Sequence, residues 1–247
     1  MSDYPLVTAI LPTRGRQALA KQALECWYAQ RWPNKEIVIA DDKEDRSFPK
    51  YTHDTENVHW FGLVGRLTVG EKRNFCCAKA KGEFVIHWDS DDWSSPDRIE
   101  DQMARLLASG KSVTGYDQML FTNGTNWWRY EGQVYGGLPK GVNGVFGTSL
   151  CYRRNWWTRH RFVDGPKNFS AHEDKAFILA ALQEDQLVEA PAKERMFARI
   201  HADNTSPKGV GDRNRWKPIT NPDIIAPLLM MSQSLGSGLP RTLFLGA

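Results

Sequence analysis

The sequence has few cysteines, no long apolar run and almost no excess of charge. Its four cysteines (Cys26, Cys76, Cys77 and Cys151) include no Cys-x-x-Cys pair, which argues against a disulfide framework or a zinc site and indicates reduced thiols in a cytoplasmic protein. No apolar run approaches the roughly 20 residues that a membrane-spanning helix needs, so we expect no integral membrane association. The net charge of +3 is too small to indicate nucleic-acid binding by itself.

The N-terminal stretch MSDYPLVTAILPTRGR also lacks basic residues before its apolar segment, so it does not predict a signal peptide. What is present is a chain of 247 residues, which is enough for one substantial hydrophobic core. We therefore predict a single domain over residues 1–247. Ten tryptophans are the one unusual feature of the composition, and several of them stand beside arginines.

The N-terminal part predicts a strand, a helix and a second strand joined by short connections. Apolar residues fill 7–11, residues 16–31 carry an apolar stripe at helical spacing, and a second apolar run covers 37–40. Because strand–helix–strand units of this kind pair their strands in parallel, this order predicts an α/β fold with a mostly parallel, Rossmann-like sheet flanked by helices.

The rest of the chain predicts more helices and strands and then a mixed half. Gly82 is placed to end one helix in a left-handed conformation, and Gly110 to end another that opens at Pro96. Residues 116–152 are rich in aromatics and glycine and predict antiparallel strands and loops. The predicted helices lie within 68–83, 96–110, 172–185 and, as a short one, 224–231, and the predicted strands are 84–88, 111–115, 187–190 and 196–200.

Carboxylates follow two of the predicted strands directly. Asp41 and Asp42 end the second strand, and the sequence DSDD at 89–92 follows a later apolar run, with a tryptophan on each side. In open α/β sheets the carboxyl ends of the strands form the ligand crevice. Mg²⁺ or Mn²⁺ would offset the repulsion among such carboxylates and could hold a diphosphate. The alternative is a solvated acidic turn in which Asp92 or Ser94 caps the next helix.

Four further groups carry a candidate function beside an ordinary structural role. Asp41–Asp42 could accept hydrogen bonds from a base or a ribose, or could form a plain turn. Lys72–Arg73 could face phosphates or only water. Glu173–Asp174 could supply a general base, or could simply favour the start of their helix. His201 could be a structural side chain or a third metal ligand.

Five segments, taken in this order, resemble a family 2 glycosyltransferase of the GT-A fold: AILPTRGR, EIVIADD, GEKRNFCCAKAKGEFVIHWDSDD, HED and RIHADNTS. The resemblance covers roughly residues 5–206. It implies an inverting transfer of a sugar from a nucleoside diphosphate sugar, assisted by Mn²⁺ or Mg²⁺. It also implies a nucleotide-sugar-binding half at 1–115, an acceptor half at 116–206 and a C-terminal extension at 207–247.

Carried over by position, the resemblance gives the donor nucleotide a set of contacts. Pro12, Thr13 and Arg14 would line the nucleotide. Asp41–Asp42 would supply one contact to the base, and Arg73 would lie near the pyrophosphate.

The resemblance also assigns the metal and the catalytic base. Asp89 and Asp91 would form the acidic pair, with Asp91 as the main metal ligand and Asp89 nearer the ribose. His201 would approach the metal or the pyrophosphate. Asp174 would be the general base for the acceptor, with Glu173 supporting it.

The sequence departs from the family pattern in two places. The loop after the first strand is Thr-Arg-Gly-Arg, where family members often have an acidic residue. The membrane helices and the QxxRW motif of processive members are absent, which argues against a polysaccharide synthase. A nucleotidyltransferase is an alternative with a similar α/β layout, but its G-x-G-T-R phosphate loop is missing.

Segments that interleave tryptophan with arginine leave a second alternative open, a non-catalytic nucleic-acid-binding protein. Stacking on tryptophan and phosphate contacts from arginine are typical of single-strand binding. The two ideas combine in a transferase whose acceptor is a hydroxylated base in DNA, reached by base flipping or in a single strand. We expect the segments 127–129 and 153–161 to border the acceptor side.

Overall fold

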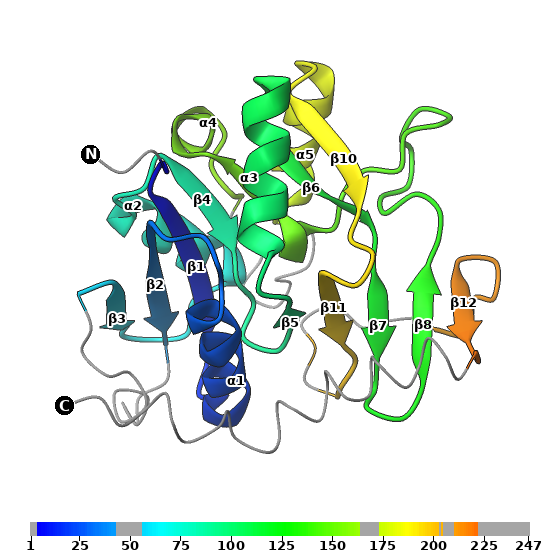
Figure 1. The fold of residues 1–247 in the computed structure, drawn as a ribbon, viewed down its shortest axis with the longest axis horizontal. Helices are drawn as coiled ribbons and strands as arrows, with labels where there is room; N and C mark the ends of the chain where they lie inside the picture. The colour runs from blue at the N-terminus through cyan, green and yellow to red at the C-terminus, as the bar shows by residue number, and fades with distance from the viewer. Residues whose placement is uncertain (1–3, 43–55, 164–172, 203, 205–209, 222–247) are drawn as a thin grey trace.

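The computed structural model describes residues 4–42, 56–163, 173–202, 204 and 210–221 of the chain. Two β-sheets lie side by side, with the helices packed around the larger one (Figure 1). None of the helices in this part of the chain combines the length and the apolar character needed to cross a bilayer. The helix predicted at 224–231 lies outside the described residues.

The larger sheet has seven strands, and six of them run in parallel. The antiparallel exception is β9, which lies between β6 and β4. Because β1, β2 and β4 are parallel neighbours, they end at the same edge of the sheet. In spatial order the strands are β10 (Leu187–Pro191), β6 (Val113–Gln118), β9 (Cys151–Arg153), β4 (Phe84–His87), β1 (Val7–Thr13), β2 (Lys35–Asp41) and β3 (Val58–Gly62).

Helices cover both faces of the larger sheet. The helices α1 (Gln17–Tyr28) and α3 (Arg98–Ser109) pack against one face. The other face is covered by α2 (Val69–Lys79), α4 (Arg154–Arg159) and α5 (Lys175–Gln183). All four cysteines are buried free thiols. The predicted α/β architecture, with a mostly parallel sheet flanked by helices, is confirmed.

The smaller sheet has five strands and a mixed order, as the sequence of the second half predicts. Its strands are β12 (Trp216–Ile219), β8 (Trp127–Tyr130), β7 (Leu120–Thr122), β11 (Met196–Arg199) and β5 (Trp93–Ser94). Only β7 and β11 pair in parallel. An aromatic-rich core cluster fills one side of this sheet.

Gly82 does not end a helix in the left-handed conformation, so that prediction is wrong. Helix α2 ends at Lys79, and the following Ala80 is already extended. Gly82 instead lies against the start of β1, where a Cβ atom would come within 2.6 Å of the Thr8 hydroxyl. Gly110 does end α3 with φ of +70°, as predicted.

Four elements were not predicted from the sequence: β3, β5, α4 and β12. Strand β5 has only two residues. Strand β3 is a five-residue edge strand whose side chains are mostly half-buried, so it shows no continuous apolar run. Helix α4 has only six residues, too few for a helical periodicity. Strand β12 contains a proline and two exposed residues.

Candidate active site

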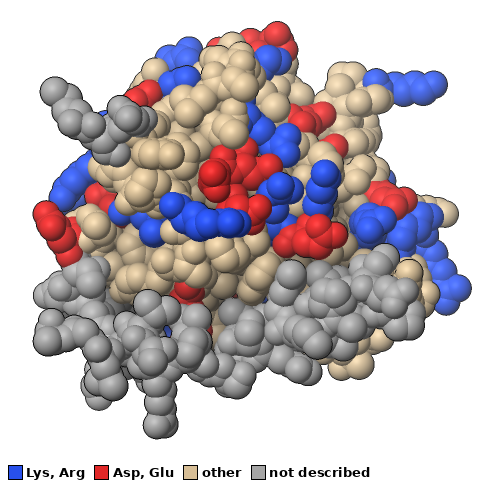
Figure 2. Space-filling view, in the orientation of Figure 1, with Lys and Arg blue, Asp and Glu red and all other residues tan. Residues whose placement is uncertain are grey.

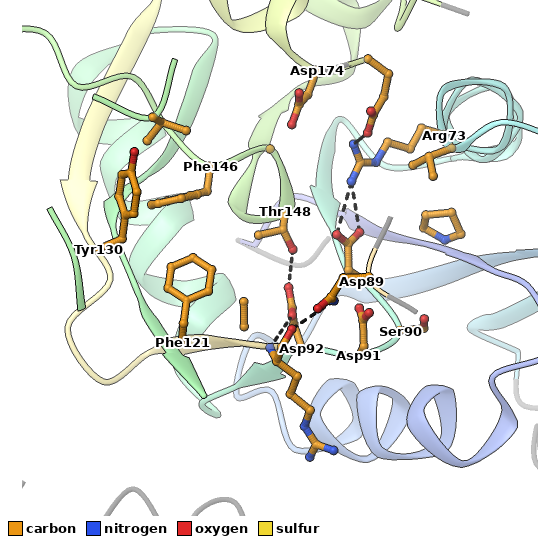
Figure 3. Close-up of a pocket in the computed structure, with 18 of the residues that line it drawn as sticks. Arg73, Asp89, Ser90, Asp91, Asp92, Phe121, Tyr130, Phe146, Thr148 and Asp174 are labelled. Carbon is orange, nitrogen blue, oxygen red and sulfur yellow. Dashed lines mark hydrogen bonds and ion pairs between the residues drawn. The ribbon is translucent and has the colours of Figure 1, made fainter. Parts of the chain in front are cut away.

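A cavity of about 300 Å³ opens where the carboxyl edge of the larger sheet meets the smaller sheet (Figure 3). Five carboxylates line it, and we call them the acidic rim: Asp89, Asp91, Asp92, Glu173 and Asp174. They come from two segments, one directly after β4 and one directly before α5. The structure therefore brings together the two acidic motifs that the sequence singles out.

A buried cation holds the DSDD loop from beneath. The Arg98 guanidinium donates to the His87 carbonyl at 2.8 Å and to the Ser94 hydroxyl at 2.8 Å, and it lies 4.9 Å from the Trp88 ring. The Ser94 hydroxyl therefore accepts from Arg98 and does not cap a helix. Helix α3 begins after Asp97, with no side-chain cap, so the interpretation of the loop as a capping turn is wrong.

Asp92 is turned toward the neighbouring loop and toward the smaller sheet. It accepts a hydrogen bond from the Thr148 hydroxyl (Figure 3) and one from the backbone N–H of Arg199 at 3.3 Å. Desolvation, followed by the negative charges of Asp91 and Asp89, raises the pKa of Asp92 to about 8. Asp92 therefore carries a proton more readily than an exposed aspartate does.

Asp91 and His201 meet, although they are 110 positions apart in the chain. The Asp91 Oδ2 atom lies 2.9 Å from His201 Nε2 and accepts from Arg16 Nη1 at 2.9 Å. Among the described residues there is no cluster of three His, Cys, Asp or Glu side chains around a metal position. One carboxylate and one imidazole do suit Mn²⁺ or Mg²⁺ when phosphate oxygens and waters complete the coordination.

Arg73 joins the two acidic segments. From its buried position on α2 it donates to Glu173 through Nη1 and to Asp89 through Nη2 at 3.2 Å (Figure 3). The start of α2 is fixed because Thr68 and Glu71 form a capping box there. One guanidinium thus holds a carboxylate of the DSDD loop beside the carboxylates at the start of α5.

Glu173 and Asp174 differ in environment. Burial raises the pKa of Glu173 to about 7, with Arg73 opposing and Asp174 adding to that rise. Asp174 lies against Gly147, where a Cβ atom would come within 1.3 Å of its Oδ2 atom. Gly147 is itself fixed because buried His87 donates from Nδ1 to its carbonyl at 2.6 Å. Only glycine at this position leaves room for Asp174 in the cavity.

Among the residues predicted to contact the nucleotide, some line the cavity or are exposed near it in the chain, and others are buried. Pro12 lines the cavity. The side chain of Arg14, two residues later, is 45% exposed. Thr13 is buried. Asp41 and Asp42 are also buried, and neither lines the cavity.

Hydrogen bonds and ion pairs account for both of these buried carboxylates. The Asp42 carboxylate accepts from Lys72 Nζ at 3.1 Å and from the Leu67 N–H at 2.8 Å. Arg14 forms an ion pair with it at 3.3 Å and donates to the Asp42 backbone carbonyl at 3.0 Å. Asp41 accepts from the Gly15 N–H at 3.2 Å. Contact between this pair and the nucleotide base stays a prediction. In the structure, the two side chains hold the loop that follows β1 in place.

Sequence reasoning did not identify the opposite side of the cavity. Five rings from the smaller sheet and its connections line it. The Tyr135 hydroxyl is hydrogen-bonded to Asp174, and we call the other four rings the aromatic wall: Phe121, Tyr130, Phe146 and Trp216. Figure 3 shows Phe121, Tyr130 and Phe146 grouped across the cavity from the acidic rim. The richness of residues 116–152 in aromatics was the available signal, but it does not say which rings face a cavity.

The segments that interleave tryptophan with arginine are mostly part of the core. Trp127 is 2% exposed, Trp156 0% and Trp157 5%. The Arg159 guanidinium lies 5.0 Å from the Trp156 ring, and the Arg161 guanidinium 5.1 Å from the Trp157 ring. The interpretation of these three tryptophans as exposed stacking surfaces is therefore wrong, and Arg159 and Arg161 lie over the rings of Trp156 and Trp157. Neither of the two segments expected at the acceptor side, 127–129 and 153–161, lines the cavity.

A family model described as Glycosyl transferase family 2 matches residues 8–182. Among curated proteins, the chain is 25% identical over 162 residues to "Putative colanic acid biosynthesis glycosyl transferase WcaA" of Escherichia coli, a match that covers 63% of this chain and 55% of that protein. The chain spans about half the length of the curated relatives it matches.

Solved structures share the fold. Staphylococcus aureus TarS 1-349 in complex with UDP-GlcNAc has a TM-score of 0.63 at 20% identity, over 81% of this chain and 60% of that one. The mannosyltransferase PcManGT of Pyrobaculum calidifontis, in complex with GDP-Man and Mn²⁺, has a TM-score of 0.61 at 15% identity, over 95% of this chain and 70% of that one. The GT-A fold expected from the sequence is confirmed.

Proposed function

Because this chain belongs to glycosyltransferase family 2, we propose that it transfers a sugar from a nucleoside diphosphate sugar to an acceptor hydroxyl. The observation that carries this proposal is the convergence of the DSDD loop and Glu173–Asp174 on one cavity. A donor site and a candidate base thus face the same space. Solved structures with this fold hold UDP-GlcNAc or GDP-Man, which supports a nucleotide sugar as the donor.

We place the donor at the carboxyl edge of the larger sheet, where Pro12 lines the cavity. Thr13, Arg14 and the Asp41–Asp42 pair complete the proposed nucleotide site. Asp89 is 24% exposed and would contact the ribose. Arg73 keeps its proposed place near the pyrophosphate, since it lines the cavity as well.

The metal site proposed here consists of Asp91 and His201, with Asp89 beside them. Mn²⁺ or Mg²⁺ bound there would supply positive charge against the charge that develops on the departing diphosphate. Support comes from the short distance of 2.9 Å between the Asp91 carboxylate and the His201 imidazole, and from a solved structure of this fold that holds Mn²⁺ with GDP-Man.

Asp174 is the proposed general base, and Glu173 supports it. The acceptor oxygen attacks the anomeric carbon, its proton passes to the Asp174 carboxylate, and the bond between that carbon and the diphosphate oxygen breaks. The nucleoside diphosphate leaves with the electron pair, and a single displacement inverts the anomeric configuration. Arg73 holds Glu173 and Asp89 in fixed relative positions during this step.

The acceptor proposed from the sequence, a hydroxylated base in DNA, loses its main support because most of the tryptophans concerned are buried. On the face viewed in Figure 2, acidic and basic side chains are interleaved over most of the surface, and basic ones gather only at its right edge, near β12. No observation in the described part of the chain favours nucleotidyl transfer or non-catalytic nucleic-acid binding as a second function.

A panel of nucleoside diphosphate sugars tests the proposal. We expect one of them, with Mn²⁺, to raise the melting temperature and to be hydrolysed slowly. A ligand at 100 times its dissociation constant adds about 2.7 kcal/mol of stability. Asp91→Ala is expected to lose the metal-dependent part of that gain. Equal thermal shifts with and without metal in both proteins would refute the metal site, and no shift with any donor would refute the transfer.

A further inference from the structure

The aromatic wall is a compact group of rings packed edge to face. Phe121 lies 5.4 Å from Phe146 and 4.8 Å from Trp216, and Tyr130 lies 5.3 Å and 5.0 Å from the same two rings. The interplanar angles run from 63° to 80°. Phe146 is half-buried, whereas the other three are buried except where they meet the cavity.

The wall is uncharged, and its one hydroxyl faces the backbone. Tyr130 donates from that hydroxyl to the Gln133 carbonyl at 2.8 Å, so the wall presents carbon and ring surface to the cavity. The polar groups stand opposite. Thr148 and Asp174 line the same cavity, and Figure 3 shows Asp174 across from the labelled rings, whereas the Thr148 hydroxyl is turned toward Asp92.

On the basis of this juxtaposition, we propose that the aromatic wall is the acceptor subsite and that the acceptor presents a neutral sugar ring. This inference rests on the proposed function and names its acceptor class. A sugar ring has an apolar C–H face and a rim of hydroxyls, which matches an apolar wall opposite the carboxylates of the acidic rim. The apolar face packs on the rings, and a hydroxyl then lies toward Asp174.

Two features of the wall argue against other acceptors. An extruded nucleobase is held between parallel ring faces or similar flat surfaces, whereas these rings are close to perpendicular to one another. A phosphate-bearing acceptor end would need a cation, and the arginines that line the cavity, Arg16, Arg73 and Arg199, lie outside the wall. Arg16 and Arg73 are already paired with carboxylates of the acidic rim. A neutral ring with C–H groups on several sides can instead contact perpendicular rings simultaneously.

Part of this subsite lies beyond the segment that the family model matches. That match ends at residue 182, whereas Trp216 belongs to β12 and reaches the cavity through its contacts with Phe121 and Tyr130. The C-terminal extension therefore contributes to acceptor choice in this chain, while the carboxylates of the acidic rim lie within the matched segment.

The test compares acceptors and ring variants with the donor that the panel identifies. Neutral oligosaccharides and oligonucleotides containing a hydroxymethylated base are offered as acceptors. We expect a neutral oligosaccharide to be glycosylated. We expect Phe146→Leu to raise the KM for that acceptor about two- to twelvefold relative to any change in the KM for the donor, since an aromatic contact contributes about 0.5–1.5 kcal/mol. Phe146→Tyr retains the ring and is expected to recover most of that loss. Phe61→Leu is the matched control, a half-buried phenylalanine on edge strand β3, outside the cavity.

Each other outcome overturns the inference. An equal effect of Phe146→Leu and Phe61→Leu on the KM for the acceptor would show that the wall does not contact it. Donor hydrolysis without transfer to any neutral saccharide, or transfer to the oligonucleotide alone, would show that the acceptor class is wrong while the proposed function stands. Failure to bind or hydrolyse any nucleotide sugar would remove the proposed function itself, and the subsite with it.

Discussion

The acidic rim and the aromatic wall face each other across one cavity, but opposite kinds of interaction hold them in place. Hydrogen bonds and ion pairs fix the rim, with Arg73 bridging Asp89 and Glu173 and with Arg16 and His201 on Asp91. Edge-to-face contacts between uncharged rings fix the wall. Electrostatic interactions are strong where little water is present. Single substitutions in the rim are therefore expected to change stability or activity more than single substitutions in the wall do.

The largest effect is expected at Asp174, where the rim meets the reacting hydroxyl. Asp174→Asn removes the base but keeps the shape, so we expect transfer to fall by about 10² to 10⁴ while donor binding is nearly unchanged. The measurement is the transfer rate beside the donor dissociation constant. Asp185→Asn is a suitable control, because the Asp185 side chain is 91% exposed. Loss of nucleotide binding in Asp174→Asn would instead assign Asp174 to the donor site or to the fold.

The next effect tests whether the rim depends on its bridging cation. Arg73→Met leaves Asp89 and Glu173 without their shared partner, and we expect it to lower the free energy of unfolding by about 3–5 kcal/mol. Urea denaturation measures this loss. Arg159→Met is the control, since its ion pair with Glu184 is exposed and is expected to contribute less than about 1 kcal/mol.

A second substitution sharpens this test. In Arg73→Met with Glu173→Gln, one of the two unpartnered carboxylates is removed, so part of the lost stability should return. If the double variant is no more stable than Arg73→Met, the cost comes from lost packing of the arginine and not from unbalanced charge.

The rim and the wall also differ in what the sequence could predict. The strands before Asp41 and Asp89 follow from apolar runs, and the position of the carboxylates after those runs predicts one crevice, because parallel strands end at one edge. The family resemblance implied only that His201 approaches the metal or the pyrophosphate, and no local pattern predicts its contact with Asp91, 110 positions away.

Which side chains pair with one another inside the site could not be predicted, for the same reason. Arg73 and Glu173 are 100 positions apart, and Asp42 is occupied by Lys72 only because α2 packs beside β2. The wall is harder still, because its rings come from separate strands and loops of the smaller sheet. Their common orientation depends on the register of short strands, and a composition rich in aromatics does not encode that register.

A smaller effect is expected from the proton that Glu173 holds. Its pKa of about 7 in the folded protein lies above the unfolded value of 4.5, so its stabilising contribution is full below pH 4.5 and is lost as the pH rises through about 7. We expect the protein to lose on the order of 1–2 kcal/mol between pH 5 and pH 8, and Glu173→Gln to lose less. Melting temperatures across this range measure the difference. Parallel curves for the two proteins would show that Glu173 is ionised throughout.

The smallest effect is expected for the binding of DNA. Measuring it tests whether any part of the molecule outside the rim and the wall binds an anionic acceptor. Trp156 and Trp157 are buried, and Arg159 and Arg161 lie over their rings, so few free stacking faces remain in segment 153–161. Each phosphate contact adds about 0.9 to the slope of log K against log salt, and we expect a slope of less than about 2 for single- and double-stranded DNA. Titration at low and moderate salt measures it. A steep slope that falls by about 1 in Arg159→Met would show that this arginine binds phosphate despite its contact with Trp156, and the hydroxylated DNA base would then replace the neutral sugar as the acceptor to pursue.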